Sequence, residues 1–248
     1  MRTAQLLQPG VVPYADAYGW MHELAAQRAA GEIPDALMLL EHPPTYTVGR
    51  RSDPTHLVWT RGQMESLGAE LHEVDRGGSV TFHGPGQLVG YPIVDLGVKP
   101  DVIRHLRMLE EVVIRAAGDV GVELGRDPER TGVWSGDRKV CAIGVKLERA
   151  RVTLHGFALN CATDLAWFDA IVPCGLADRG VATLTQLAGR EITVEELTPL
   201  VIRHFEDVFE LRLEHSQVRD APVVPGRAAG QVRLSGSSRS GAGGEGES

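Results

Sequence analysis

Cys174 stands in surroundings that suit a reactive thiol. Proline precedes it and glycine follows it in the run Pro173-Cys174-Gly175. The proline ring fixes the backbone before the thiol and the glycine permits a sharp turn after it, so we expect this cysteine on a loop. Cys141 and Cys161 fall in strand-like runs (KVCAIGV and ALNCATD) and are expected as inert core thiols, the commoner fate of cysteine. Cys174 is therefore the candidate nucleophile, and the alternative is a partly buried loop thiol.

Lysine is rare in this chain, which makes Lys139 a candidate base. Only Lys99, Lys139 and Lys146 are lysines among the 25 basic residues. Two-residue alternation along KVCAIGVK places Lys139 on the apolar face that carries Cys141. An ammonium on such a face loses solvation, which favours the neutral amine, whereas arginine does not release its proton. The alternative is a lysine at a strand end with its head in water, and Lys146 has the same ambiguity.

The run from Arg76 to Tyr91, RGGSVTFHGPGQLVGY, is rich in glycine around a short strand-like stretch. Paired glycines let the backbone approach a ligand and present N–H groups to it, and Arg76 could hold an anion or carbonyl beside them. The run is not a phosphate-binding loop, because no GKS or GKT follows. Two tight turns that flank a strand are the alternative interpretation.

A second glycine, Gly156, stands inside the strand-like run from Val152 to Asn160. Glycine weakens a strand unless something must come close to its backbone. A ligand chain lying against the strand is one explanation, and a bulge is the other. The nearby His155, like His83, is expected as a supporting group.

Composition excludes several other classes of function. The net charge is −8, which argues against nucleic-acid binding. The three cysteines are odd in number and show no CxxC spacing, which argues against a disulfide framework and a four-cysteine zinc site. A mixed Cys/His metal site is the open alternative, but no pair of the nine histidines has ligand-like spacing, so no metal is expected. No apolar run is long enough to span a membrane and no signal peptide is visible, so we expect a cytoplasmic protein. Basic residues outnumber acidic ones between 138 and 151, a surface that could dock an acidic partner or be only a solvated face.

The elements that must position these residues are helices and hairpins in irregular order. One helix is expected over Asp101–Gly121, with Asp101 as its cap. A second is expected over Thr193–Phe209, with Thr193 and Glu196 as a capping box unless Pro199 moves the start to Thr198. A third, weaker helix is expected over Ala15–Ala30. The expected strands are Ala36–Glu41, Thr45–Arg50, Ser79–Phe82, Leu88–Val94, Lys139–Leu147 and Val152–Asn160, the last two forming a hairpin. This order predicts an α+β or mixed-sheet α/β fold in one domain, residues 1–220, followed by a disordered tail over 221–248.

Three runs, taken together, resemble the lipoyl(octanoyl) transferase family, also called lipoate-protein ligase B: RGGSVTFHGPGQLVGYP, GVWSGDRKVCAIGVKLERARVTLHGFALN and DLAWFDAIVPCG. The resemblance extends from about Leu37 to Leu187 and implies the fold of the catalytic domains of lipoate-protein ligase A and biotin protein ligase. It also implies that Cys174 is an acyl-thioester nucleophile and Lys139 its partner. The residues that it implies for substrate binding are Arg76, Gly77, Gly78, Ser79, Val80, Thr81, Phe82, His83, Ala142, Ile143, Gly144, Gly156, Phe157 and Ala158.

The resemblance further implies transfer of an octanoyl group from acyl carrier protein to a lysine of lipoyl domains, those of 2-oxoacid dehydrogenase complexes and of the glycine cleavage H protein. The Cys174 thiolate would attack the octanoyl thioester, with N–H groups of the Gly77-Gly78 turn stabilising the oxyanion. The acceptor lysine would then attack the acyl-cysteine while Lys139 takes its proton. Because an amide forms downhill from a thioester, no nucleotide or other cofactor is expected.

Three alternatives stay open at this point. The main one is an ATP-dependent lipoate or biotin ligase of the same fold, which activates the acid as an adenylate and needs no nucleophilic cysteine. The second is a non-catalytic module that binds carrier protein or lipoyl domains. The third is a cysteine hydrolase, which is disfavoured because Cys174 has no recognisable histidine and aspartate or asparagine motif around it.

Overall fold

The computed structural model describes residues 2–149, 151–172 and 180–216. The helices in this part are α1 (Tyr14–Ala30), α2 (Arg61–Ser66), α3 (Val102–Asp119), α4 (Leu184–Ala188) and α5 (Val194–Phe209), with short 3₁₀ turns η1 (Pro54–His56) and η2 (Leu165–Ala170). The strands are β1 (Arg2–Val11), β2 (Asp35–Glu41), β3 (Thr45–Val48), β4 (Glu70–Glu73), β5 (Val80–His83), β6 (Gln87–Ile93), β7 (Gly125–Arg126), β8 (Val133–Ser135), β9 (Arg138–Glu148), β10 (Val152–Asn160) and β11 (Leu211–His215). None of the described helices is long and apolar enough to span a membrane.

Two sheets organise the described residues. Eight strands form the large sheet in the order β11-β1-β2-β6-β10-β9-β8-β7, and three form the small sheet in the order β4-β3-β5. β1 pairs in parallel with both β2 and β11, while β6, β10 and β9 pair antiparallel. The predicted mixed-sheet α/β class is therefore confirmed, as is the hairpin of β9 and β10.

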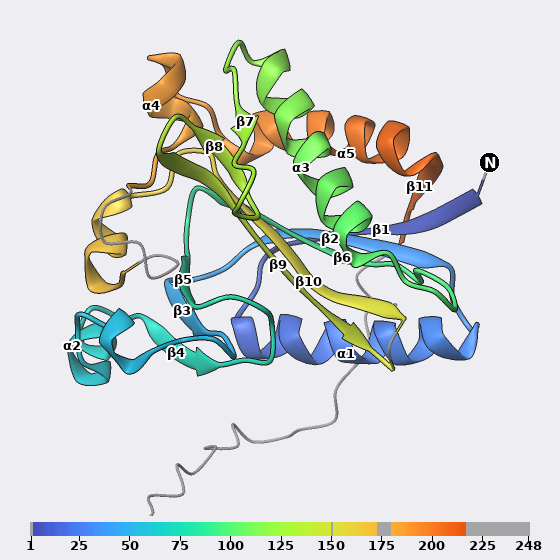
Figure 1. The fold of residues 1–248 in the computed structure, drawn as a ribbon, viewed down its shortest axis with the longest axis horizontal. Coiled ribbons are helices and arrows are strands. Elements are labelled where there is room, and N and C mark those ends of the chain that lie inside the picture. The colour runs from blue at the N-terminus through green and yellow to red at the C-terminus, as the bar shows by residue number, and fades with distance from the viewer. Residues whose placement is uncertain (1, 150, 173–179, 217–248) are drawn as a thin grey trace, which may run out of the picture.

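Helices cover both faces of the large sheet (Figure 1). α1 lies along one face, and α3 and α5 lie on the other. Buried Met21 and Leu24 of α1 pack with Met38 and Val89 of the sheet. On the opposite face, a larger cluster joins α3 and α5 to strands β9 and β10 and includes Leu159. The site-bearing strands are thus held between two apolar cores.

The long helices begin largely where the sequence predicts. The Asp101 carboxylate accepts a hydrogen bond from the Arg104 N–H at 2.8 Å, as expected for a cap of α3. Thr193 likewise caps α5 by accepting from the Glu196 N–H, but the expected capping box is wrong. The Glu196 side chain instead binds Arg190, which lies outside the helix. Pro199 does not reset the start, because it is accommodated within the helix.

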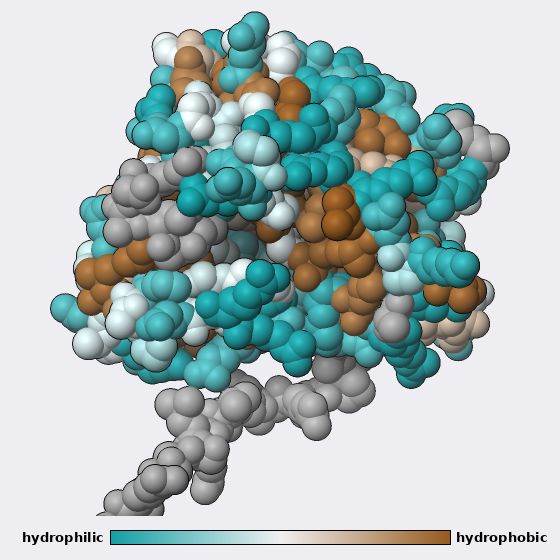
Figure 2. All heavy atoms as spheres, viewed as in Figure 1, coloured by the Kyte–Doolittle hydropathy of each residue, from teal (hydrophilic) through white to brown (hydrophobic). Residues whose placement is uncertain are grey.

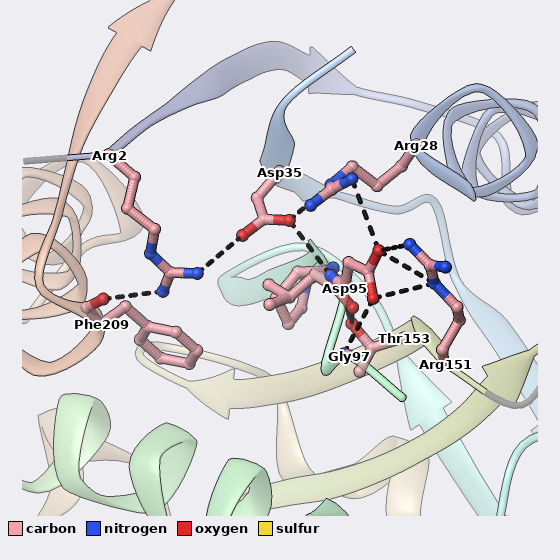
Figure 3. Close-up of polar contacts among 10 residues, drawn as sticks. Arg2, Arg28, Asp35, Asp95, Gly97, Arg151, Thr153 and Phe209 are labelled. Carbon is pink, nitrogen blue, oxygen red and sulfur yellow. Dashed lines mark hydrogen bonds and ion pairs between the residues drawn. The ribbon is translucent and has the colours of Figure 1, made fainter. Parts of the chain in front are cut away.

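A buried ion-pair network fastens the end of α1 to the large sheet (Figure 3). The side chains of Asp35 and Asp95 are each only 6% exposed. Arg28 of α1 bridges them, at 2.7 Å to Asp35 and 3.5 Å to Asp95, while Arg2 approaches Asp35 and Arg151 binds Asp95. Because each buried carboxylate has a guanidinium partner, burial of these charges is compensated. The network ties α1, β2 and the loops beside β6 and β10 into one unit.

Candidate active site

One pocket unites the segments that the sequence analysis selected. Strands β5, β9 and β10 and the loop before β5 supply most of its wall. The predicted residues that line it are Arg76, Gly77, Gly78, Ser79, Val80, Thr81, His83, Lys139, Ala142, Ile143, Gly144, Gly156, Phe157 and Ala158. Figure 2 shows a hollow near the middle of the face, in the region where Figure 1 shows the paired strands β9 and β10. Hydrophobic side chains line one side of this hollow. The segments 76–83, 142–144 and 156–158 thus meet, although they are far apart in the sequence.

One of the predicted site residues that the structure describes does not line this pocket. Phe82 is fully buried in the core of the small sheet, where its ring stacks on Trp167 at 5.3 Å. It belongs to a hydrophobic cluster with Tyr46 and Phe168, so its expected contact with substrate is not supported by its position. Cys174 lies outside the described residues, and its role stays a prediction.

Lys139 lies in the pocket wall with only 8% of its surface exposed. Its Nζ is 4.6 Å from the centre of the Trp134 ring, a cation–π distance. The expected alternation with Cys141 is interrupted by a bulge, because Val133 pairs with Cys141 while the next residue, Trp134, pairs with Lys139. Cys141 therefore packs in the core under α3, whereas Lys139 lies with Ala142 in the pocket.

The other two cysteines behave as predicted. Cys141 and Cys161 are fully buried free thiols. Burial raises the pKa of the Cys141 thiol well above its usual range and that of Cys161 to about 12. Cys161 stands one residue beyond β10 and not within it. Neither thiol is suited to nucleophilic attack at neutral pH, because the thiolate is the reactive form.

The loop before β5 is organised by Arg76. Its guanidinium donates to the carbonyl and hydroxyl oxygens of Thr47 in β3, at 2.7 and 2.9 Å, and to the carbonyl of Gly77 at 3.1 Å. The Gly77 N–H points to the carbonyl of Val145 at 3.4 Å. That N–H therefore bonds within the protein in this arrangement, and stabilisation of an oxyanion by the Gly77-Gly78 turn stays a prediction.

Gly156 is explained by packing. A Cβ on this residue would lie 2.1 Å from the carbonyl oxygen of Gly90 and 2.5 Å from Cδ of Pro92, both in β6. The neighbouring ring of Phe157 would in turn come within 2.2 Å of a Cβ on Gly90. The close approach that the sequence predicts therefore exists, and the adjacent strand β6 makes it.

A charged network adjoins the pocket at His155. This residue has φ of +61° within β10, a left-handed conformation that costs free energy for a residue with a Cβ. Its Nε2 binds Asp75 at 2.9 Å, and Lys146 binds the other carboxylate oxygen at 2.6 Å. The hydrogen bonds from His155 and Lys146 hold the pKa of Asp75 far below its usual range. Burial lowers the pKa of His155, so the imidazole is neutral near pH 7.

His83 is held in one tautomer. Its Nδ1 lies 2.9 Å from Oε1 of Gln87, and the Gln87 amide donates to Oδ1 of Asn160 at 2.9 Å. With Gln87 oriented in this way, Nδ1 of His83 carries the proton and Nε2 is the acceptor. Burial lowers the pKa of His83 far below its usual value, so this ring is neutral.

Two tyrosines of the pocket were missed by the sequence analysis. Tyr14 opens α1 and stacks on His83, with 6.1 Å between the ring centres, and Tyr91 of β6 binds Nε2 of His42 at 2.7 Å. The other ring nitrogen of His42 donates to the carbonyl of Val12 at 2.6 Å. No local pattern marks these residues, because they reach the pocket through pairing and packing between distant segments.

The fold is that of a lipoate ligase catalytic domain. The structure of lipoate-protein ligase A bound with ATP matches with a TM-score of 0.73 and 17% identity, covering 89% of this chain and 91% of that one. Biotin protein ligase from Aquifex aeolicus in complex with biotin and ATP matches with a TM-score of 0.50 and 12% identity, covering 85% and 71%. At these identities the likeness shows the fold alone.

The chain belongs to the lipoyl protein ligase A/B catalytic domain family, which it matches over residues 13–206. It is also 52% identical over 201 residues to an octanoyltransferase of Rubrobacter xylanophilus, an alignment that covers 81% of this chain and 90% of that protein. The family that the three sequence runs predict is therefore confirmed.

Proposed function

We propose that this protein transfers an octanoyl group from octanoyl-acyl carrier protein to a lysine of a lipoyl domain, through a thioester on Cys174. The acceptors are the lipoyl domains of 2-oxoacid dehydrogenase complexes and the glycine cleavage H protein. The acyltransferase class rests on the curated relatives, since that of Rubrobacter xylanophilus is an octanoyltransferase 52% identical to this chain. The donor, the intermediate and the residue roles below are proposals.

The observation that carries the residue roles is the position of Lys139. Among the described residues of the pocket wall it is the one lysine, and it is 8% exposed beside small and apolar residues such as Ala142 and Ala158. Both backbone groups of Lys139 bond to the segment that follows residues 173–179: its N–H donates to Gly180 and its carbonyl accepts from Ala182, each at 3.0 Å. A lysine fixed in this way supports the role of base, since a base must lie within hydrogen-bond reach of the proton that it removes.

The reaction follows in two balanced steps. In the first, the Cys174 thiol loses its proton and its sulfur forms a thioester with the octanoyl carbonyl carbon. The bond between that carbon and the carrier's sulfur breaks, and the carrier leaves as a thiol that carries the proton lost by Cys174. In the second, the acceptor lysine nitrogen forms an amide with the same carbon and the bond to Cys174 breaks. Lys139, as the amine, takes the proton of the attacking nitrogen and returns it to the cysteine thiolate. No phosphate is consumed in either step.

The apolar part of the wall suits an acyl chain. Ile143, Phe157 and Ala158 present hydrocarbon, and Gly144 and Gly156 leave space at the backbone. Each buried CH₂ of the chain contributes about 0.8 kcal/mol. Because this increment is small, steric exclusion at the closed end of the site must reject longer chains.

The proposal is tested by supplying a purified lipoyl domain with either octanoyl-acyl carrier protein alone or octanoate with ATP and Mg²⁺. We expect the octanoyl lysine amide only with the carrier-bound donor. The Cys141→Ser variant, changed at a core thiol, serves as control and keeps the transfer. Product formation that needs octanoate and ATP would instead assign the protein to the ligases, and binding without product would favour the non-catalytic module.

A further inference from the structure

Glu110 is a carboxylate buried in the apolar face of α3. Its side chain is 0% exposed, and it lies beside core residues Leu109 and Val113. A buried carboxylate is costly unless its oxygens are paired and hydrogen-bonded. Oε2 meets this condition with Arg107 at 2.7 Å and Arg126 at 3.2 Å.

The other oxygen of Glu110 reaches the backbone. Oε1 accepts the N–H of Gly132 at 3.1 Å, in a contact between residues 22 positions apart. Gly132 immediately precedes β8 and has φ of +128°, a conformation that glycine adopts without strain. Glu110 therefore fixes the backbone at the entry to β8, at a point where the chain has no regular structure.

The entry to β8 is in contact with Lys139. A Cβ on Gly132 would lie 3.4 Å from Cε of Lys139 and 2.7 Å from the carbonyl oxygen of Cys141, so the backbone of Gly132 packs directly on the lysine stem. Two residues later, the ring of Trp134 lies under Nζ at 4.6 Å. Gly132 and Trp134 thus confine the Lys139 side chain from the β8 side.

We propose that Glu110 is a positioning residue for Lys139, acting through its hydrogen bond to Gly132. Glu110 is absent from the residues that line the pocket, so it acts through this contact and not on substrate. A lysine side chain is flexible, with four rotatable carbon–carbon bonds in its stem, and a fixed neighbour reduces the number of positions that its amine samples. This inference rests on the proposed function only for the chemical role of Lys139; the positioning itself is a property of the structure.

The three lysines of this chain make the positioning directly measurable. With ¹³C-labelled lysine, the protein gives ε-CH₂ signals for Lys99, Lys139 and Lys146, and single Lys→Arg variants assign them. The Trp134 ring current should move the Lys139 signal upfield of the other two, because nuclei above an aromatic ring are shielded. The size of this upfield shift reports whether Lys139 stays over the ring.

Two substitutions at Glu110 separate the effect of its side-chain length from the effect of its charge. Glu110→Gln keeps the length of the side chain and an oxygen that can accept from Gly132, whereas Glu110→Asp keeps the charge but withdraws the carboxylate by one methylene. We expect the glutamine variant to retain the upfield Lys139 signal and the aspartate variant to lose it. Glu111→Gln is the matched control, since Glu111 also binds Arg126, at 2.5 Å, and has no bond to Gly132. Thermal unfolding of each variant establishes that the signals come from folded protein.

Kinetics with octanoyl-acyl carrier protein complete the test. For Glu110→Asp we expect kcat/KM for the lipoyl domain to fall about tenfold with kcat/KM for the carrier protein within about twofold, since an interaction needed only for the proton transfer of the second step is weakened. The opposite order, with aspartate retaining and glutamine losing the Lys139 signal, would show that charge balance at the arginines matters and would overturn the proposal. An unchanged signal in both variants would overturn it as well. If the native protein transfers no octanoyl group, the proposed function fails while the lysine signals still decide the positioning.

Discussion

The N–H of Lys139 donates to the carbonyl of Gly180 at 3.0 Å, which joins the start of β9 to the first described residue after the stretch 173–179. Val181 forms a parallel bridge with Lys139 at the same place. Gly180 and Val181, which follow the stretch that contains Cys174 in the sequence, therefore contact the proposed base. The partnership of Cys174 and Lys139 stays a prediction.

Replacement of Lys139 by arginine should abolish turnover while the fold survives. Arginine keeps the positive charge over Trp134 but does not act as a base at neutral pH. Loss of general-base catalysis predicts a fall in kcat of about 10²–10⁴-fold. Lys99→Arg, at an exposed lysine outside the pocket, is the control and should be active. Turnover of Lys139→Arg close to that of the native protein would mean that Lys139 acts only through its charge.

Gly156→Ala should be strongly destabilising. The new methyl group would lie 2.1 Å from the Gly90 carbonyl, and neither central strand can move without breaking the pairing of β6 and β10. Overpacking of this kind costs about 1–3 kcal/mol or more in the free energy of unfolding, which denaturant titration measures. Gly118→Ala in α3 is the control: its Cβ has open space, so it should stabilise by about 0.5–1 kcal/mol. Equal stability of the two variants would contradict the packing explanation.

Asp95→Ala should unfold more easily than a comparable surface variant. The change deprives Arg151 of the carboxylate that it binds and leaves Arg28 with Asp35 alone in the buried network of Figure 3. It should lower the free energy of unfolding by about 2 kcal/mol, within the range for hydrogen bonds to charged groups. Asp119→Ala is the control, because the Asp119 side chain is 34% exposed in its pair with Arg203. Solvent screens such an exposed pair, so this variant should lose less stability than Asp95→Ala. A similar loss at both positions would argue against a structural role for the network.

The protein should lose stability between pH 7 and pH 5 because of buried histidines. Burial lowers the pKa of His42 and of His105 to about 4, and that of His83 well below its usual value. Since an unfolded histidine titrates near ~6.5, the unfolded state binds more protons as the pH falls, and the free energy of unfolding decreases. Each such histidine should contribute a loss of about 2 kcal/mol by pH 5.

The variant His105→Phe isolates one of these contributions. Neither ring nitrogen of His105 has a hydrogen-bond partner in the part of the chain that the structure describes, and the ring packs edge-on against Phe209. Phenylalanine should therefore be tolerated at this position. The variant should lack the contribution of His105 to the change in the free energy of unfolding between pH 7 and pH 5. A free energy of unfolding that stays constant from pH 7 to pH 5 in the native protein would refute this explanation.

Sequence patterns predicted the elements whose cause is local. The Asp101 cap and the apolar stripe located α3, and the charged turn located the hairpin of β9 and β10. β1 and β11 were missed, because their pairing joins residues about 200 positions apart, Arg2 with Leu211, and no local signal reports it. The capping box at Thr193 failed because Arg190 offered Glu196 a charged partner.

In the site, too, features with local causes were predicted and features that depend on tertiary structure were not. Glycine-rich runs and the family resemblance selected the segments that the pocket unites, but the orientation of single side chains depended on tertiary structure. Alternation placed Lys139 with Cys141, and the bulge opposite Trp134 separates them. Phe82 was expected at the substrate and lies in the core of the small sheet. The role of Cys174 stays a prediction.

The central claim is the acyl-cysteine, and intact-mass spectrometry tests it most directly. The native protein and Cys174→Ser are each mixed with octanoyl-acyl carrier protein in the absence of ATP, and a lipoyl domain is then added. We predict one octanoyl adduct on the native protein, mapped to Cys174 by peptide analysis, absent from the variant and discharged by the lipoyl domain. Transfer of the octanoyl group by Cys174→Ser at the native rate, or no adduct on the native protein while octanoate and ATP support transfer, would contradict the account.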